Sequence, residues 1–203
     1  MMEAFITNVF DFDNTIYDGE STFDFYLFCV KHHPKALKFV LIVIWSLFKY
    51  KLCLVSETQL MNLAEKYVSD FLMCCPDADE LAHKFWHKNF RKIKPFYYDV
   101  KREDDVVISA SFGFLLRPAL EKLGIKNFIL SEVNLDNSKV LRLCYRKNKL
   151  KLFNEHFDGT VVDDVYTDSY NDLPLMSLSS KRIFLVKGNR IVDITKEKSD
   201  EYE

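Results

Sequence analysis

The sequence predicts an α/β protein whose core is a parallel β-sheet covered by helices and interrupted by an all-helical insertion. Short apolar segments rich in β-formers occur near both ends of the chain, and helical patterns separate them in the C-terminal half. Residues 23–96, by contrast, contain no glycine and repeat apolar residues at helical spacing. With 203 residues, 48% of them hydrophobic, the chain is long enough for one such core plus an insertion.

The expected elements follow one another along the chain. A buried strand is expected at residues 4–10, directly before the polar segment DFDNT, and several helices are expected between residues 23 and 96. We therefore expect residues 1–17 and 101–203 to form the α/β core domain and residues 18–100 to form a helical domain. The further strands are expected at residues 105–109, 127–131, 140–144, 160–165 and 183–186, with helices at 115–123 and 150–156. A turn at residues 187–189 is expected to lead from the last of these strands into a short partner strand at 190–194.

Charge and cysteine content exclude several classes of protein. A formal net charge of −2 provides no basic field for nucleic-acid binding. The five cysteines are odd in number, two are adjacent and none form a Cys-x-x-Cys pair, which argues against a disulfide framework or a zinc site. Because the N-terminal segment has neither a basic start nor a cleavage pattern, we expect no secretory signal and a cytoplasmic protein.

Asp11 and Asp13 follow the first expected strand, two residues apart. Ligands of open α/β sheets bind beyond the carboxyl ends of the strands, so both residues lie where chemistry is expected. One carboxylate can attack phosphorus, while the other protonates the leaving oxygen and then activates water. Repulsion between the two tends to raise the pKa of one, which then keeps the proton that an acid needs. Taken alone, an Asp-x-Asp pair is better explained as part of a solvated loop than as a catalytic pair. The choice between the two interpretations therefore depends on the other motifs.

Polar residues near the ends of later strands favour the chemical interpretation. Ser109 ends the strand expected at residues 105–109, and Asp168 and Asp172 follow the strand expected at 160–165. Carboxylates at that edge are hard oxygen ligands for Mg²⁺, which allows an anionic nucleophile to approach a phosphate. Between these segments Lys149 begins an amphipathic helical piece, and its ammonium group can hold the nucleophile and the phosphoryl oxygens together.

These four segments, in this order, resemble the motifs of the haloacid-dehalogenase-like (HAD) superfamily. DFDNTI resembles the first motif, with Asn14 where glycine is commoner, and Ser109 in SAS resembles the second. DSYNDLPL resembles the fourth motif as it occurs in the subfamily with a helical cap. The resemblance implies a Rossmann-like core with a helical cap that closes over the site. It also implies a phosphatase or phosphotransferase, because members that carry out carbon–halogen chemistry lack an acid at the position of Asp13.

The resemblance gives each motif residue a role. Asp11 is the nucleophile, which forms a phospho-aspartyl intermediate, and Asp13 is the general acid and base. The remaining residues bind Mg²⁺ or the phosphate: Asp11, Asp168 and the main-chain carbonyl of Asp13 for the metal, with Asp172 nearby, and Thr15 and Ser109 for the phosphate.

The third motif departs most from the pattern of the superfamily. A glycine usually stands a few residues before the lysine, and CYRKNKLKLF contains none. Lys149 fits best because an apolar-periodic helix follows it, while Lys147 and Lys151 stay open as alternatives.

Several other polar groups have simpler interpretations. Residues 158–160, Asp-Gly-Thr, resemble part of the first motif but lack the preceding Asp-x, so we expect a turn there. Asp163 and Asp164 lie near the expected metal site, although the spacing of the fourth motif favours the later aspartate. His83 and His87 have the spacing of a metal pair on one helix face, but lysines surround them and no glutamate follows His83, so we expect a solvated helix.

The insertion carries the features that bear on the substrate. Residues 39–48 are apolar except Ser46 and are followed by Lys49 and Lys51, a segment too short to span a membrane. We expect it at the centre of the helical bundle, and the alternative is an interfacial patch that contacts a membrane. The length, apolar cap and fourth motif resemble phosphatidylglycerophosphate phosphatases, which implies a lipid-linked phosphate as substrate.

Phosphoserine phosphatases are the other relatives that the motifs resemble. Glu20 lies nine residues after Asp11, where these enzymes place a glutamate near the substrate amine; the alternative is a polar residue at the hinge of the cap. They also bind the substrate carboxylate with a cap arginine, whereas this chain has no arginine before Arg91. A lipid-linked or otherwise amphiphilic phosphate is therefore the preferred substrate class. A small soluble phosphate is the alternative, and a catalytically inactive HAD-fold binding module is a remote one.

Overall fold

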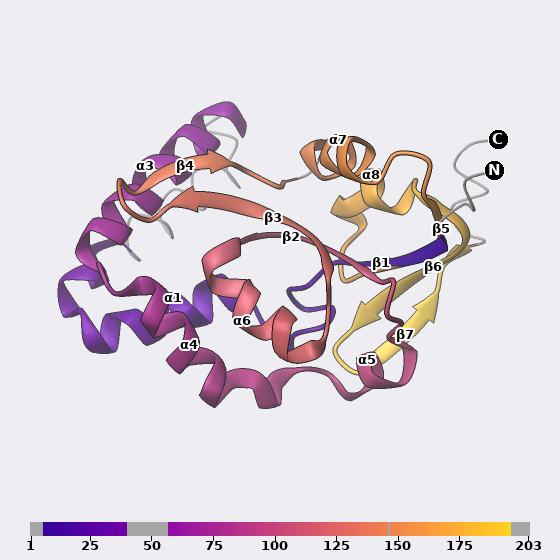
Figure 1. Cartoon of the computed structure of the whole chain (residues 1–203), viewed down its shortest axis with the longest axis horizontal. Coiled ribbons are helices and arrows are strands. Elements are labelled where there is room, and N and C mark those ends of the chain that lie inside the picture. The colour runs from indigo at the N-terminus through magenta and orange to yellow at the C-terminus, as the bar shows by residue number, and fades with distance from the viewer. Residues whose placement is uncertain (1–5, 40–56, 146, 196–203) are drawn as a thin grey trace.

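The computed structural model describes residues 6–39, 57–145 and 147–195. In this part of the chain seven strands form one sheet in the order β4-β3-β2-β1-β5-β6-β7 (Figure 1). The strands β3, β2, β1, β5 and β6 run parallel to one another, as the sequence predicts. The bounds of the strands are β1 Ile6–Phe10, β2 Val106–Phe112, β3 Asn127–Asn134, β4 Lys139–Arg142, β5 Val161–Thr167, β6 Ser179–Lys187 and β7 Arg190–Asp193.

The two outer strands, β4 and β7, are antiparallel hairpin partners. For β7, which pairs with β6, this agrees with the short final partner expected from the sequence. The alternation of elements in the sequence places the strand expected at residues 140–144 among the parallel strands. In the structure this strand is β4, and it pairs antiparallel with β3. Only residues 135–138 separate β3 from β4, and a parallel connection needs about a dozen residues or more. The prediction of a parallel sheet is therefore wrong for this strand.

Alternate side chains of the strands point into two apolar layers. Val9 and Val106 belong to the cluster that includes α7 and α8, and their neighbours Phe10 and Val107 belong to the cluster that includes α6 and α5. In Figure 1 α7 and α8 lie above the strands and α6 lies below them. The molecule is thus a sheet with helices on both faces. The bounds of these helices are α5 Pro95–Val100, α6 Gly113–Leu123, α7 Lys147–His156 and α8 Leu173–Met176.

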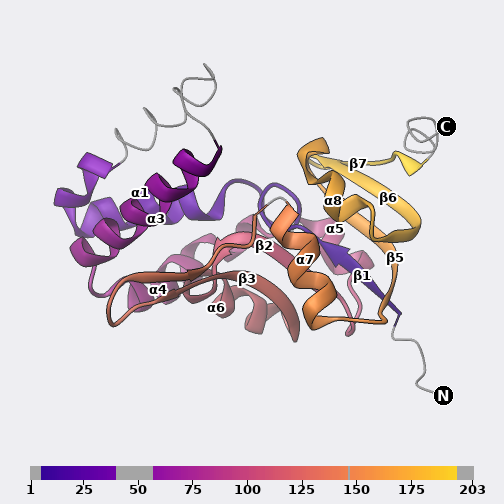
Figure 2. The same ribbon diagram turned by 90° about the horizontal axis from the view of Figure 1, so that it is seen from above.

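The described residues between β1 and β2 form helices in succession, as predicted. Figure 2 shows α1 and α3 at the opposite end of the molecule from β6 and β7. Within the described residues no helix has the length and apolar character needed to cross a membrane. Of the apolar segment 39–48 only Phe39 is described, and it is buried; residues 40–48 lie outside the described residues. The elements of this region are α1 Ser21–His32, the 3-10 turns η1 Pro34–Ala36 and η2 Phe90–Lys92, α3 Glu57–Cys74 and α4 Ala78–Asn89.

Helix α4 shows how the helical region is attached to the sheet. Its apolar residues recur at helical spacing, so Phe85 and Trp86 are buried while His83 and His87 are exposed. The solvated interpretation of the two histidines is therefore confirmed. The indole Nε1 of Trp86 donates a hydrogen bond to the carbonyl of Leu115 in α6 at 2.5 Å. One apolar cluster runs from α4 through α6 to the sheet, and the division at residues 18 and 100 stays a prediction.

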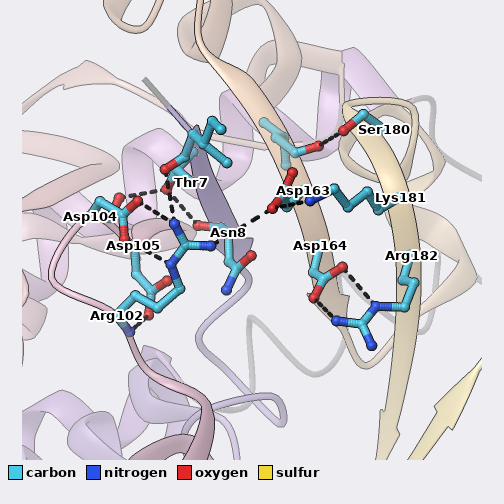
Figure 3. A network of polar contacts seen from close by, with 12 residues as sticks. Thr7, Asn8, Arg102, Asp104, Asp105, Asp163, Asp164, Ser180, Lys181 and Arg182 are labelled. Atoms are coloured by element: carbon cyan, nitrogen blue, oxygen red, sulfur yellow. Dashed lines mark hydrogen bonds and ion pairs between the residues drawn. The ribbon is translucent and has the colours of Figure 1, made fainter. Parts of the chain in front are cut away.

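A polar network occupies the amino-terminal edge of the parallel strands (Figure 3). Asp164 of β5 accepts two hydrogen bonds from the guanidinium group of Arg182 in β6, and Asp163 pairs with Lys181 at 2.7 Å. In the loop before β2, Arg102 pairs with Asp104 at 2.7 Å. The ion pairs of Asp163 and Asp164 join β5 to β6, at the edge opposite to the one expected to carry chemistry.

Asp105 lies next to this network but is buried, with 1% of its surface exposed. One carboxylate oxygen accepts a hydrogen bond from the main-chain amide of Arg102 at 2.7 Å. The other oxygen has no hydrogen-bond partner among the described residues. Burial raises the pKa of Asp105 to about 7, so the folded protein favours the neutral carboxyl.

We predict that Asp105→Asn raises the thermal midpoint at pH 8 and that this gain shrinks towards pH 5. The stability that Asp105 contributes is complete below the pKa of an unfolded aspartate and is lost as the pH rises through about 7. A neutral asparagine avoids that loss, and each kcal/mol corresponds to about 2–4 °C in a chain of this length. Thermal unfolding of both proteins at pH 5, 6, 7 and 8 measures the difference.

The matched control is Asp136→Asn, which changes an exposed aspartate in the turn between β3 and β4. It should leave the midpoint nearly unchanged at each pH. A gain for Asp105→Asn that is equal at pH 5 and pH 8 would contradict the assignment of a raised pKa to Asp105.

Candidate active site

The carboxyl ends of β1, β2 and β5 meet at one edge of the sheet. Asp11 follows β1 directly, and its amide donates to the carbonyl of Tyr166 in β5 at 2.9 Å. Ser109 lies in the middle of β2, which continues to Phe112, so the expectation that this serine ends the strand is wrong. Asp168 follows β5 directly. Because the three strands are parallel neighbours, these residues of distant sequence lie at the same edge.

The loop after β1 turns sharply and returns towards its start. Asn14 has a φ of 56°, a left-handed conformation that asparagine tolerates better than most residues and that glycine adopts freely. Its amide donates to the carbonyl of Gly19 at 2.9 Å. This conformation explains why a glycine position in the motif can be occupied by asparagine.

The two linkers between the sheet and the helical region pair with each other beside this loop. The amide of Asp18 donates to the carbonyl of Lys92, and the amide of Lys94 donates to the carbonyl of Ile16, both at 2.8 Å. The Lys94 side chain is buried and its ammonium group donates to the carbonyl of Asn14. Burial lowers the pKa of Lys94. Sequence patterns give no signal for this lysine, because only the pairing of the linkers turns it towards the loop.

Lys149 joins two of the predicted carboxylates. Its Nζ donates to Oδ1 of Asp11 at 2.8 Å and to Oδ2 of Asp172 at 3.1 Å, and the lysine is 5% exposed. Although burial disfavours the charged form, the two carboxylates raise the pKa of Lys149. Lys151 is exposed and pairs with Glu155, and nothing is described of the Lys147 side chain. Among the described lysines of this segment, the geometry therefore favours Lys149.

Asp11, Asp168 and Asp172 form an acidic cluster. One carboxylate oxygen from each lies within 4.8 Å of the others. Burial raises the pKa of Asp11 to about 7, against the lowering effect of Lys149 and with a further rise from Asp172. Burial and Asp172 also raise the pKa of Asp168. A set of oxygen ligands with more negative charge than the adjacent lysine balances is suited to a divalent cation.

The carboxylate of Asp13 is held apart from this cluster by neutral donors. Its Oδ1 accepts from the main-chain amide of Ser21 and its Oδ2 from the hydroxyl of Ser111, both at 2.6 Å. Burial raises the pKa of Asp13, against these hydrogen bonds, which lower it. Ser111 is absent from the sequence prediction, although it lies two residues after Ser109 in a strand, and residues at that spacing share a face.

The three residues predicted to bind substrate come from the loop after β1, from the start of α1 and from β2. Thr15 is fully buried, and its hydroxyl has no hydrogen-bond partner among the described residues. The hydroxyl of Ser109 accepts from the amide of Ser111 at 3.1 Å. Glu20 accepts from the amide group of Asn14 at 2.6 Å, and burial, with the charge of Asp13, raises the pKa of Glu20.

The comparison with protein families agrees with this arrangement. The family model of haloacid dehalogenase-like hydrolases matches residues 9–177, which run from β1 to the end of α8. The chain belongs to this family. The resemblance inferred from the four motifs is therefore confirmed. No curated protein matched the sequence of this haloacid dehalogenase-like hydrolase.

Solved structures share the fold at low sequence identity. A protein of unknown function from Bordetella pertussis Tohama I has a TM-score of 0.67 and 15% identity, over 86% of each chain. A HAD family hydrolase from Salmonella enterica serovar Typhi has a TM-score of 0.59 and 10% identity, over 87% of this chain and 61% of that chain. A phosphoserine phosphohydrolase-like protein from Francisella tularensis SCHU S4 has a TM-score of 0.51 and 16% identity, over 89% of this chain and 85% of that chain.

The remaining polar groups weighed in the sequence lie away from the site of this HAD hydrolase. Asp163 and Asp164 pair with basic residues at the opposite edge of the sheet (Figure 3). Residues 158–160 form the expected turn, in which the amide of Thr160 donates to the carbonyl of Phe157 at 3.1 Å and Gly159 has a φ of 75°.

We predict that Lys149→Met destabilises the protein at pH 8 by about 3 kcal/mol, because it leaves buried carboxylates without their cation. The loss should be smaller at pH 5, since protonation of Asp11 removes much of the unpaired charge. Urea unfolding at both pH values measures the free energy of unfolding.

Lys151→Met is the control, because Lys151 is exposed and its pair with Glu155 spans one turn of the same helix. It should cost less than about 0.5 kcal/mol. Equal losses for the two variants would contradict the central position given to Lys149.

Proposed function

We propose that this HAD hydrolase is a Mg²⁺-dependent phosphomonoester hydrolase that works through a phospho-aspartyl intermediate on Asp11. The observation that carries the proposal is the contact between Asp11 and Lys149 within the cluster formed with Asp168 and Asp172. It gives a buried carboxylate a fixed orientation and a neighbouring positive charge. The name of the similar Francisella protein, a phosphoserine phosphohydrolase-like protein, is in line with this reaction class.

In the first step a carboxylate oxygen of Asp11 forms a bond to phosphorus as the bond from phosphorus to the ester oxygen breaks. Asp13 gives its proton to the leaving oxygen. In the second step Asp13 takes a proton from water, whose oxygen attacks phosphorus and releases phosphate and the Asp11 carboxylate. The different surroundings of the two aspartates support this division of roles, since Asp11 pairs with a lysine and Asp13 with neutral donors.

The other residues of the site hold the phosphoryl group and its charge. Lys149 keeps Asp11 oriented and balances charge on the phosphoryl oxygens. The buried hydroxyl of Thr15, which has no partner among the described residues, and the hydroxyl of Ser109 are suited to donate to those oxygens. In the mechanism that we propose, they fix the phosphorus in line with Asp11.

Asp11, Asp168 and the main-chain carbonyl of Asp13 would hold Mg²⁺, with Asp172 close by. The all-oxygen cluster and its excess negative charge fit this ion. Bound there, the ion neutralises phosphate charge and lets an anionic nucleophile approach.

We further propose that residues 18–100 act as a cap over a core made of residues 1–17 and 101–203. Both linkers leave the sheet beside the site, where Tyr17 and Ile93 pair through a short antiparallel bridge. A cytoplasmic location is in line with the free thiols of the described cysteines Cys29, Cys74, Cys75 and Cys144.

For the substrate we propose a lipid-linked or otherwise amphiphilic phosphate. Helix α1, which begins directly after Glu20, exposes half of Phe23 and 40% of Leu27, one turn apart. Such a surface near the site favours an apolar substituent on the phosphate, with contact to a membrane surface.

A small soluble phosphate is the second candidate, favoured by the carboxylate of Glu20, which offers a partner for a substrate amine. A catalytically inactive binding module is the remote alternative.

The proposal is tested by phosphate release from phosphatidylglycerophosphate in detergent, phosphoserine and sugar phosphates, with Mg²⁺ and with EDTA. We expect Mg²⁺-dependent release that is strongest on the lipid. Asp11→Asn should lower kcat by at least about 10³-fold, because the nucleophile is lost. Release confined to soluble esters would favour the second candidate. Full turnover by Asp11→Asn would exclude the phospho-aspartyl mechanism, and silence of the native protein on every ester would favour a binding module.

A second test separates metal binding from catalysis. Asp168→Asn should weaken Mg²⁺ binding at least about tenfold in a calorimetric titration, because it removes one charged ligand. Asp163→Asn changes an aspartate of β5 that pairs with Lys181 at the opposite edge of the sheet, and it should bind Mg²⁺ like the native protein. Equal affinities for the two variants would contradict the assignment of the ion to the Asp11, Asp168 and Asp172 cluster.

A further inference from the structure

Ser111 occupies a central position among the hydroxyl groups of the site. Its Oγ donates to Oδ2 of Asp13 at 2.6 Å. The same oxygen lies 2.8 Å from the hydroxyl of Thr22 and 3.1 Å from the hydroxyl of Ser21, both in the first turn of α1. Its main-chain amide donates to the hydroxyl of Ser109. One residue of β2 thus contacts the proton-transfer group, a phosphate-binding candidate and the helical region.

The number of protons on each group decides which group donates in these hydrogen bonds. While Asp13 is ionised, its carboxylate only accepts hydrogen bonds, so the single proton of the Ser111 hydroxyl goes to Asp13. In this state Ser21 and Thr22 donate to the lone pairs of Ser111. Ser111 is buried, with 4% of its surface exposed, so water has little access to these hydrogen-bonding groups. The Asp13 carboxylate therefore has one oxygen fixed by α1 through the Ser21 amide and the other fixed by β2 through Ser111.

An irregularity in β2 brings the serine into this place. The register of β2 with β3 shifts between Ile108 and Phe112. Such a shift re-aims side chains and is common next to active sites. In this segment Ala110 is exposed while Ser109 and Ser111 are buried, so both hydroxyls face the site.

We propose that Ser111 is the positioning residue for Asp13, and that it holds the carboxylate in the orientation for both proton transfers only while the first turn of α1 is seated against β2. The inference rests on the proposed phosphatase function. It gives the helical region a part in the chemistry: displacement of α1 removes the donors of Ser21 and Thr22 together with the Ser21 amide. Asp13 then keeps only the Ser111 hydroxyl, whose orientation the hydroxyl groups of α1 no longer fix.

The main test is Ser111→Ala, measured on p-nitrophenyl phosphate and on the best alkyl phosphate of the substrate panel. We expect kcat to fall about 10- to 100-fold on both, with KM within about threefold, since positioned acid–base groups contribute about 10²–10⁴-fold. The p-nitrophenolate group leaves without a proton. Its first turnover should therefore stay near the native rate and appear as a burst, followed by slow turnover, whereas the alkyl phosphate shows no burst.

Two further variants distinguish a loss of positioning from a folding defect. Ser111→Thr retains the hydroxyl and should restore most of the activity and abolish the burst. Thr22→Val keeps the shape of a partly exposed side chain and removes only its donor, so we expect a smaller fall, about two- to fivefold, with the same burst. The control is Ser131→Ala: this serine is equally buried, but its hydroxyl bonds main-chain groups of Ala110 and Cys144 instead of a carboxylate. It should keep kcat within about twofold.

Each outcome decides between explanations. Native kcat for Ser111→Ala on both substrates would overturn the inference. A fall without a burst that Ser111→Thr does not rescue, matched by Ser131→Ala, would assign Ser111 a purely structural role and overturn it too. Absence of phosphatase activity in the native protein would instead overturn the proposed function on which the inference rests.

Discussion

The register of β1 between β2 and β5 determines the geometry of the whole site. Phe10 stacks on Tyr166 with 4.4 Å between ring centroids and meets Tyr97 edge-on at 5.1 Å. The amide of Asp11 continues the pairing with β5 one residue beyond the strand. A slip by one residue would turn Phe10 to the opposite face of the sheet, at the cost of a large buried ring. Asp11 would then no longer meet Lys149, so the packing of one aromatic side chain fixes the position of Asp11.

Charge imposes the second constraint on this edge of the sheet. One buried lysine, Lys149, contacts Asp11 and Asp172, while Asp168 lies in the same cluster without that contact. Burial raises the pKa of both Asp11 and Asp168. Asp13 does not depend on this lysine, because its carboxylate accepts hydrogen bonds from a hydroxyl group and a main-chain amide. The fold therefore gives two neighbouring carboxylates of one loop different electrostatic surroundings, which is the condition under which two carboxyl groups can take different parts in acid–base chemistry.

Sequence patterns could predict the residues that follow apolar strands, since strand ends are readable locally. The sequence favours Lys149 but leaves Lys147 and Lys151 open, although buried Leu152 and Phe153, three and four residues later, mark the Lys149 side of α7. The antiparallel pairing of β4 depends on the short connection after β3, which the alternation of elements does not reveal. Ser111 escapes sequence analysis because its partner Ser21 is 90 residues away, and no local pattern reports a contact at that separation.

The apolar cluster shared by α4, α6 and the loop after β1 limits which changes to the helical region the fold tolerates. Trp86 of α4 meets the rings of Phe12 and Tyr17 edge-on, at centroid distances of 5.9 Å and 5.3 Å. Exchange of the helical region for another one would uncover these rings and the adjoining face of α6. The helical region is therefore packed as part of the same core, and replacing it would require matching side chains at this interface. Point changes on surfaces outside the shared cluster, such as the outer side of α1, would leave this packing intact.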